Sequence, residues 1–293
     1  MKREKFTVWD ALIYLVLGLF CLSIVVAFLH LLNLSFSPSY IATKGGLLLL
    51  PRDVTLDNYA KVITNKYIWQ GYRNTILRTA VGTVVQLLFT AMGAYVLSKR
   101  YFPHRTFWTF FIVFTMFFSG GLIPTFLVVK SLGLLDTFAV MILPGLISAY
   151  NLTIMRNFFQ SLPEEIEESC MIDGAGRFRI FFQFILPLSM PILATVALWL
   201  AVGHWNAWFD VLIYISDETK FTLQIVLRRI IITGSKEILD TTASARSVSD
   251  EPLVSSEGLK AACIFVTTLP ILCVYPFIQR YFVKGIMVGS LKG

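Results

Sequence analysis

The chain has 293 residues, of which 56% are hydrophobic and only 15% are charged, and its formal net charge is +7 at pH 7. Soluble domains carry about 25% charged residues, so the composition excludes a soluble protein and predicts an integral membrane protein. The positive charge fits the anionic headgroups of a lipid bilayer, and no nucleic-acid partner is expected.

Six apolar stretches come close to the length of about 20 residues that crosses a bilayer as a helix. They predict transmembrane spans at residues 11–33, 72–97, 107–129, 138–158, 192–215 and 259–282. The first stretch continues through Leu34 without a small-residue cleavage site, so it is predicted to remain as a helix rather than to be removed as a signal peptide. The expected fold is an all-α integral membrane protein with one transmembrane domain, residues 1–293, in the plasma (inner) membrane.

The distribution of basic residues predicts the orientation of these spans. Three basic residues precede the first span, and the ten residues after it carry none. The short loop 98–106 also has three, whereas the short loop 130–136 on the opposite side has one. Because basic residues in short loops favour the cytoplasmic side, both chain termini are expected in the cytoplasm. Two arginines near the start of the second span, Arg73 and Arg78, are expected to snorkel to the outer face.

Two longer segments, residues 35–71 and 216–258, fall outside the membrane in this orientation. At this length each segment could be a docking surface for an external protein or a mere connection. The sequence leaves both possibilities open.

Residues 159–191 form a polar segment between the fourth and fifth spans, on the predicted cytoplasmic side. Four of its residues are glutamates: Glu164, Glu165, Glu167 and Glu168. A carboxylate near the centre of a bilayer costs about 2.5–3.5 kcal/mol, so this segment is predicted to lie in water at the membrane surface.

Local signals predict a short helix in this segment. Ser161 is expected to cap it, with Pro163 in the first turn and Glu164 at the capping-box position. Asp173 and Gly174 are expected to end it, because glycine readily adopts the left-handed conformation of a helix C-cap. A second short helix is expected near residues 177–184, and Pro187 and Pro191 then redirect the chain into the fifth span.

The same segment resembles the EAA motif of ABC importer permeases. The resemblance rests on the letters ESCMIDGA at residues 168–175 and FILP at residues 184–187. Ser169 and Cys170 stand where the motif has alanines, and Phe184 replaces an aliphatic residue. The six spans are also spaced like those of the maltose-type carbohydrate permeases. The resemblance implies an ABC type I importer permease fold, in which this loop forms a coupling helix that fits a groove on cytoplasmic ATPase subunits.

The resemblance also implies site residues and partners. The implied ATPase-coupling residues are Glu164, Glu165, Glu168, Ser169, Cys170, Asp173, Gly174, Ala175, Leu186 and Pro187. The C-terminal tail is similar to that of the same subfamily, which implies contacts of Lys284, Gly289 and Lys292 with the ATPase. The implied partners are a second homologous permease in a heterodimer, two ATP-binding subunits and an extracellular solute-binding protein. ATP and Mg would be bound by the partner subunits, and no cofactor by this chain.

The transported solute is expected to be a carbohydrate. The stretches 118–125, 143–145 and 150–152 resemble a branch of these permeases associated with complex oligosaccharides and uronides. Polar and aromatic side chains suit a sugar pathway, and polar groups within spans normally face the protein interior. The candidate pathway residues are Ser119, His204, Trp205 and Asn206.

Catalysis by this chain is not expected, because the sequence contains none of the motifs GxxxxGK[ST], HExxH or GxSxG. The four cysteines and three histidines show no metal-ligand spacing, so no metal site is expected. Three alternatives remain open: an ABC permease for a non-sugar solute, an ion-coupled secondary transporter and a membrane scaffold.

Overall fold

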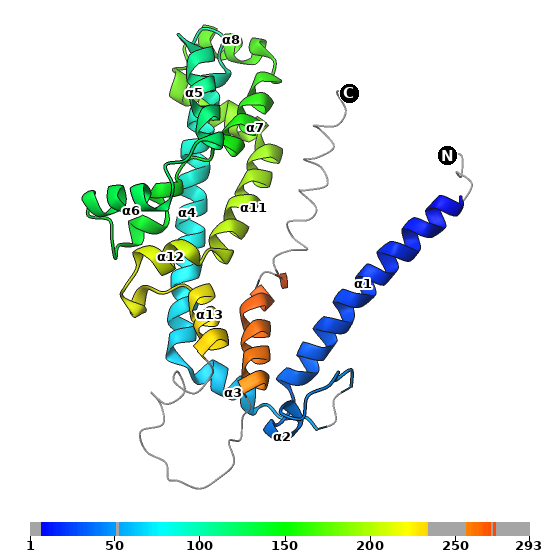
Figure 1. Cartoon of the computed structure of the whole chain (residues 1–293). Helices are drawn as coiled ribbons and strands as arrows, with labels where there is room; N and C mark the ends of the chain where they lie inside the picture. Colours follow the sequence, from blue (N-terminus) through cyan, green and yellow to red (C-terminus); the bar gives the residue numbers. More distant parts are fainter. Residues whose placement is uncertain (1–6, 51–52, 234–255, 271, 274–293) are drawn as a thin grey trace. The chain divides into compact units, whose positions relative to one another are not determined.

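The computed structural model describes residues 7–50, 53–233, 256–270 and 272–273, and every regular element in these ranges is a helix (Figure 1). The prediction of an all-α chain is confirmed for this part. The chain divides into two compact units, which are described separately. Unit 1 takes the described residues of Met1–Trp69 and Val226–Leu269, and unit 2 takes those of Gln70–Ile225 and Pro270–Gly293. The expectation of one transmembrane domain stays a prediction.

Two helices in the described residues are each long and apolar enough to cross a membrane, namely α1 (Val8–Ser35) and α4 (Lys66–Ser98). Three further pairs of helices reach that length only together, so this part has up to five candidate spans by length and composition if each bent pair counts as one. The sixth predicted span, residues 259–282, starts inside a helix at 256–270, and most of its remainder lies outside the described residues. The count of six and the cytoplasmic termini therefore stay predictions.

The predicted third span, residues 107–129, is two helices rather than one. α5 (Arg105–Phe117) and α6 (Leu122–Ser131) meet at an angle of 115°. The break contains Gly120 and Gly121, and Gly121 has a φ of +84° that side-chain-bearing residues rarely adopt. The uniform hydrophobicity of this stretch concealed the break, because both helices and the turn between them are apolar.

The predicted fourth span, residues 138–158, is also broken. It begins with two short 3₁₀ turns, η1 (Phe138–Met141) and η2 (Leu143–Gly145), and continues as α7 (Ala149–Gln160) at 57° to them. Pro144 in the second turn has no backbone N–H to donate, so it cannot take part in a regular α-helix that continues through this position into α7.

The predicted fifth span, residues 192–215, corresponds to α11 (Met190–Asn206) and the separate α12 (Phe209–Tyr214). Before it, α9 (Arg177–Ile180), the π-helical turn η3 (Phe181–Ile185) and α10 (Leu186–Leu188) form one continuous segment. This segment meets α11 at 83°. Pro187 and Pro191 flank the bend, so the direction change expected at these prolines occurs.

Unit 1 is organised around the end of α1. The described elements beside it are α2 (Ser39–Ala42), α3 (Asp57–Thr64) and the helix at 256–270. Asn58 on α3 is 1% exposed, and its side-chain amide donates to the carbonyl oxygens of Ser35 (2.9 Å) and Ser37 (3.0 Å). One buried amide thus satisfies two carbonyls that the end of α1 leaves open.

Unit 2 has its hydrophobic core where α4, α7 and α11 pack together (Figure 1). The buried residues of this core are Ala91, Ala94, Tyr95, Leu97, Leu152, Met155, Phe159, Cys170, Ile180, Phe181, Ile185, Leu193 and Val196. They come from α4, α7, α8 (Glu164–Ile172), the α9–η3 segment and α11. The polar segment 159–191 is therefore packed onto the helices by its apolar side chains.

The chain that follows α12 is held at two points. Asn74 on α4 donates its amide to the carbonyl oxygens of Thr219 (2.8 Å) and Phe221 (3.0 Å). Asp136, which has a φ of +55°, accepts the backbone N–H groups of Ser216 (2.5 Å) and Asp217 (3.0 Å). These bonds give the start of the predicted outer segment 216–258 a defined conformation.

We expect Asn58→Ala to lower the free energy of unfolding by about 2 kcal/mol, because two buried carbonyl groups lose their donor. The matched control is Thr64→Ala on the same helix, since the Thr64 hydroxyl is exposed and bonds only to carbonyl oxygens of α3 itself. Thermal unfolding of the purified protein, followed by tryptophan fluorescence, measures both variants. Equal shifts in Tm would contradict the role assigned to Asn58.

The turn at Asp136 predicts a pH dependence. The N–H groups of Asp217 and Ser216 hold the pKa of Asp136 below its ordinary value of 3.8. A carboxyl whose pKa is lower in the folded state stabilises that state above the ordinary pKa, and the contribution disappears as the pH falls through the lowered value. The Tm difference between wild type and Asp136→Asn should therefore shrink as the pH is lowered from about 6 to about 3. A constant difference would argue against this account.

Candidate functional site

The helix predicted in the polar segment is present as α8, but its N-terminal end differs from the prediction. Ser161 ends α7, and its hydroxyl donates to the carbonyl oxygen of Phe158 (2.7 Å). The N-cap of α8 is Pro163, and Glu164 is the first helical residue. The predicted capping box of Ser161 and Glu164 is therefore wrong, because α7 extends to Gln160 and uses Ser161 for its own C-terminal end.

The end of α8 agrees with the prediction. Gly174 has a φ of +79°, and its N–H donates to the carbonyl oxygen of Met171 (3.0 Å). The N–H of Ala175 donates to the carbonyl oxygen of Cys170 (2.9 Å). This pair of bonds is a Schellman motif, which closes a helix with a left-handed residue after the C-cap. Asp173 is that C-cap.

Most of the predicted coupling residues share one property, which is exposure to solvent. The exposed residues are Glu164, Glu165, Glu168, Ser169, Asp173, Gly174 and Pro187. Cys170 is buried in the core of unit 2, and Ala175 and Leu186 are partly buried against it. Two large apolar side chains at the end of the helix, Met171 (42% exposed) and Ile172 (87% exposed), also face outward. α8 thus presents acidic and apolar groups together on an open surface.

Glu167 behaves differently from the other three glutamates. It is 6% exposed, and its carboxylate forms an ion pair with Lys99, just past the end of α4. The Tyr95 hydroxyl donates to the same carboxylate (3.2 Å). Sequence analysis did not single out this residue. Helical spacing was the available signal, because Glu167 lies three residues before the buried Cys170 and therefore on the same side of the helix.

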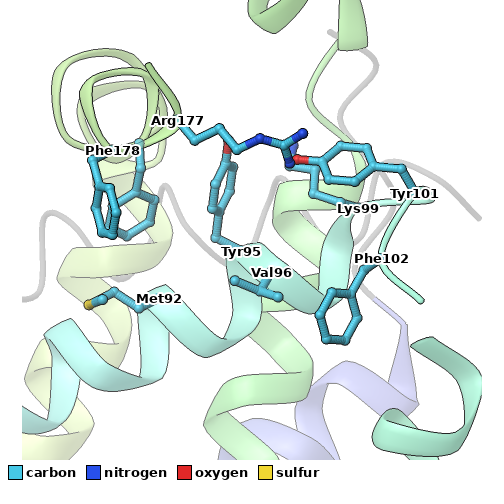
Figure 2. Close-up of a pocket in the computed structure, with 9 residues that line it drawn as sticks. Met92, Tyr95, Val96, Lys99, Tyr101, Phe102, Arg177 and Phe178 are labelled. Carbon is cyan, nitrogen blue, oxygen red and sulfur yellow. The ribbon is translucent and has the colours of Figure 1, made fainter. Parts of the chain in front are cut away.

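An apolar pocket of about 280 Å³ adjoins this ion pair (Figure 2). Figure 2 shows Arg177 of α9 reaching across the pocket toward Tyr101, with Phe178 on one side. The guanidinium carbon of Arg177 lies 4.4 Å from the ring centroid of Tyr101, and Lys99 Nζ lies 4.5 Å from that of Tyr95. Both contacts are cation–π interactions, and the one between Arg177 and Tyr101 connects the loop after α4 with the segment after α8.

A second cavity, of about 450 Å³, lies among α4, α11, α12 and the 3₁₀ turns. Its polar lining comes from Arg78, Gln86, His204, Asp210 and Tyr214, and its apolar lining includes Trp199 and Leu200. Volume and composition both fall within the range of ligand-binding pockets, which is about 300–1,000 Å³ with a few placed polar groups.

Arg78 is the centre of this cavity's polar wall. It is 3% exposed, and both terminal nitrogens of its guanidinium donate to the Asp210 carboxylate. Arg78 also donates to the carbonyl oxygen of Met141 (3.2 Å) and to Nδ1 of His204 (3.4 Å). The prediction that Arg78 snorkels to the outer face is therefore wrong. A carboxylate 132 positions away in the chain provides the counter-charge, which no local pattern could reveal.

The predicted pathway residues are not brought together. His204 lines the cavity. Trp205 packs edge-to-face on Tyr72, and the Asn206 amide donates to the carbonyl oxygen of Val202 (3.0 Å). Ser119 lies exposed at the break between α5 and α6. The tail residues Lys284, Gly289 and Lys292 lie outside the described residues.

Comparison with known families identifies the class of protein. Residues 68–288 match the family described as "Binding-protein-dependent transport system inner membrane component". The match covers more than half of the chain. It includes α8, nearly all of α4 and the residues that line the cavity. The chain belongs to this family and is thus an inner-membrane component of an ABC transporter, and the resemblance found in residues 168–187 is confirmed.

Individual relatives make the comparison more specific. The chain is 41% identical over its full length to the "Polygalacturonan/rhamnogalacturonan transport system permease protein YtcP" of Bacillus subtilis (strain 168), of which it covers 100%. It is 43% identical to "Protein LplC" of the same organism, over 92% of this chain and 90% of that protein. Among solved structures, it is similar to a chain of "a bacterial ABC transporter involved in the import of the acidic polysaccharide alginate", with a TM-score of 0.86 and 32% identity over 96% of this chain and 100% of the other.

Replacing either of two glycines near the cavity with alanine is expected to change stability differently. A Cβ atom on Gly82 would lie 2.5 Å from Nε2 of the buried His204 ring, whereas one on Gly203 would have nothing within 4 Å. Gly82→Ala should therefore displace the imidazole and lower the Tm. Gly203→Ala should leave the Tm unchanged or raise it, because alanine in a helix is favoured over glycine by about 0.5–1 kcal/mol.

Thermal unfolding of the two variants in the same detergent measures this difference. A Gly82→Ala variant as stable as Gly203→Ala would show that the close contact between α4 and His204 is not a constraint.

Proposed function

We propose that this chain is the membrane-spanning permease subunit of an ATP-driven importer of oligosaccharides. In this proposal, α8 receives the movement of cytoplasmic ATPase subunits, and the cavity around Arg78 forms part of the path of the solute. The chain itself carries out no catalysis. ATP and Mg would be bound by the partner subunits.

The observation that carries the proposal is the construction of α8. The helix is short, closed by a Schellman motif and packed onto the core through Cys170, while Glu164, Glu165 and Glu168 remain exposed. Exposed Met171 and Ile172 add apolar area to the same element. A rigid element with charged and apolar groups on an open surface is suited to a protein partner, because contacts between proteins combine an apolar centre with a polar rim. Membership of the family supports an ATPase as that partner.

The cargo is proposed from the relatives and from the cavity. The names of the similar proteins concern polygalacturonan, rhamnogalacturonan and alginate, which supports an oligosaccharide that contains acidic sugars. Trp199 offers a flat apolar face, and Gln86, His204 and Asp210 offer hydrogen-bonding groups around the same space. This combination suits a sugar ring with its apolar face and its hydroxyl rim. A non-sugar solute is the alternative.

The implied partners are a second homologous permease in a heterodimer, two ATP-binding subunits and an extracellular solute-binding protein. Segments 35–71 and 216–258 are proposed to face the binding protein. The bonds made by Asn74 and Asp136 give the first residues of segment 216–258 a defined conformation. The tail with Lys284, Gly289 and Lys292 is proposed to contact the ATPase.

The test uses the complete complex reconstituted in lipid vesicles, with Glu168→Lys as the variant. Reversing an exposed charge on α8 should reduce both uptake and binding-protein-stimulated ATP hydrolysis by about tenfold, because about 1.4 kcal/mol at the ATPase contact corresponds to that factor. The control is Lys130→Glu, a charge reversal of the same size on the exposed end of α6. It should leave both rates within about twofold.

Retention of both rates in Glu168→Lys would refute the role of α8. Uptake that runs on an ion gradient in the absence of ATP would refute the importer class and favour a secondary transporter. A complex that assembles with an ATPase but moves no solute would favour a scaffold.

A further inference from the structure

The contact between Glu167 and Lys99 is the most buried charged contact of α8. The side chains of Lys99 and Glu167 are 14% and 8% exposed, whereas those of the neighbouring pair Arg100 and Glu164 are 84% and 66% exposed. Surface pairs contribute little to stability, but removal of one partner from a buried pair costs several times more because a charge is left uncompensated. Of these two pairs, only the buried one can hold α8 firmly.

We propose that Glu167 is a positioning residue that transmits the movement of α8 to α4 through Lys99 and Tyr95. The proposal rests on the function proposed above, and it assigns the two adjacent glutamates separate tasks. Glu168 faces outward, toward the proposed ATPase surface, and Glu167 faces inward, toward the membrane helices.

Apart from the exposed pair of Arg100 and Glu164, the remaining attachment of α8 is apolar and cannot replace this contact. Cys170 is the buried apolar residue of α8 in the core of unit 2. Apolar contact is non-directional, so it permits a helix to rotate or slide on its neighbours. The ion pair with Lys99 and the hydrogen bond from Tyr95 fix both the rotation and the position of α8 relative to the end of α4.

α4 reaches from this contact to the cavity. Arg78 precedes Lys99 by 21 residues along the chain, which corresponds to about 32 Å along a helix axis. At the cavity Arg78 is bound to Asp210 on α12 and to the carbonyl oxygen of Met141 in the 3₁₀ turn η1. A displacement of α8 that moves α4 as a rod therefore acts directly on two short elements of the cavity wall.

The experiment measures coupling rather than stability. Variants of the full complex are reconstituted, and ATP hydrolysis is measured without and with the binding protein loaded with an oligogalacturonide, together with uptake of that oligogalacturonide. Glu167→Gln and Lys99→Met should retain basal hydrolysis within about twofold, but should lose about tenfold in stimulated hydrolysis and uptake, which corresponds to about 1.4 kcal/mol. Lys99→Arg preserves the charge and should restore at least about half of the wild-type coupling.

Two further variants separate coupling from folding. The double variant Glu167→Met/Lys99→Met removes both charges and leaves none unpaired, so the complex should assemble as well as wild type, as judged by size-exclusion chromatography. It should nevertheless be uncoupled. Lys130→Met, which removes one exposed positive charge on α6, should behave as wild type.

Wild-type coupling in the double variant would overturn the inference, because an apolar contact would then suffice. Wild-type coupling in Glu167→Gln, together with loss of coupling in Glu168→Lys, would overturn the inference alone and leave the proposed function standing. Full coupling in both Glu167→Gln and Glu168→Lys would refute the proposed role of α8 as well.

Discussion

A charge that is buried in a protein needs a partner there, and the architecture of unit 2 depends on how α4 and the residue just after it meet this requirement. Arg78 is paired with Asp210, and Lys99 with Glu167. Each pair joins α4, or the residue just after it, to an element far away in the sequence, because an unpaired buried charge is costly. The two pairs thus fix the register of the elements beside the first half of the helix and at its C-terminal end, and the apolar core lies between them.

The break in the predicted fourth span, residues 138–158, has a related cause. A helix that lies in lipid must satisfy its backbone groups internally, whereas irregular backbone is tolerated where protein or a cavity supplies partners. The turn at 138–145 follows this rule, since the Met141 carbonyl accepts from Arg78 and the Gly145 carbonyl accepts from Gln86 (2.7 Å). Polar side chains of α4 therefore do more than line the cavity. They supply the hydrogen bonds that the 3₁₀ turns lack.

The sequence predicted the class of fold and the presence of α8 because those features depend on local patterns. Long apolar runs, acidic residues at a helix start and the glycine at position 174 each act within one or two helical turns. The breaks in three of the predicted spans were not predicted, because glycine and proline are common within transmembrane helices and hydropathy does not register the angle between two apolar helices.

The candidate site was predicted in part for the same reason. Outward-facing residues such as Glu168 and Gly174 belong to a contiguous motif, so one stretch of sequence was sufficient to find them. The partners of Arg78 and Glu167 lie 132 and 68 positions away. Only the folded chain brings those charges together, and a lone charged residue near the end of a predicted span has the same appearance in the sequence whether it snorkels or forms a buried pair. His204, Trp205 and Asn206 point in different directions because neighbours on a helix are about 100° apart, but the cavity, the Tyr72 ring and the other surroundings that they meet are set by the folded chain.

The contact with α8 and the cavity around Arg78 constrain the sequence in different ways. At the α8 end, Glu167 and Lys99 are buried as an ion pair, so few combinations of charge and size are acceptable there. At the cavity, Trp199, Gln86 and His204 line open space, so under the proposed function a change of side chain there alters the solute that fits without disturbing the ion pair near Lys99. A fold built in this way can be shared by importers of different solutes. The TM-score of 0.86 at only 32% identity to a chain of the alginate importer is consistent with such a separation, because the backbone path agrees while about two thirds of the side chains differ.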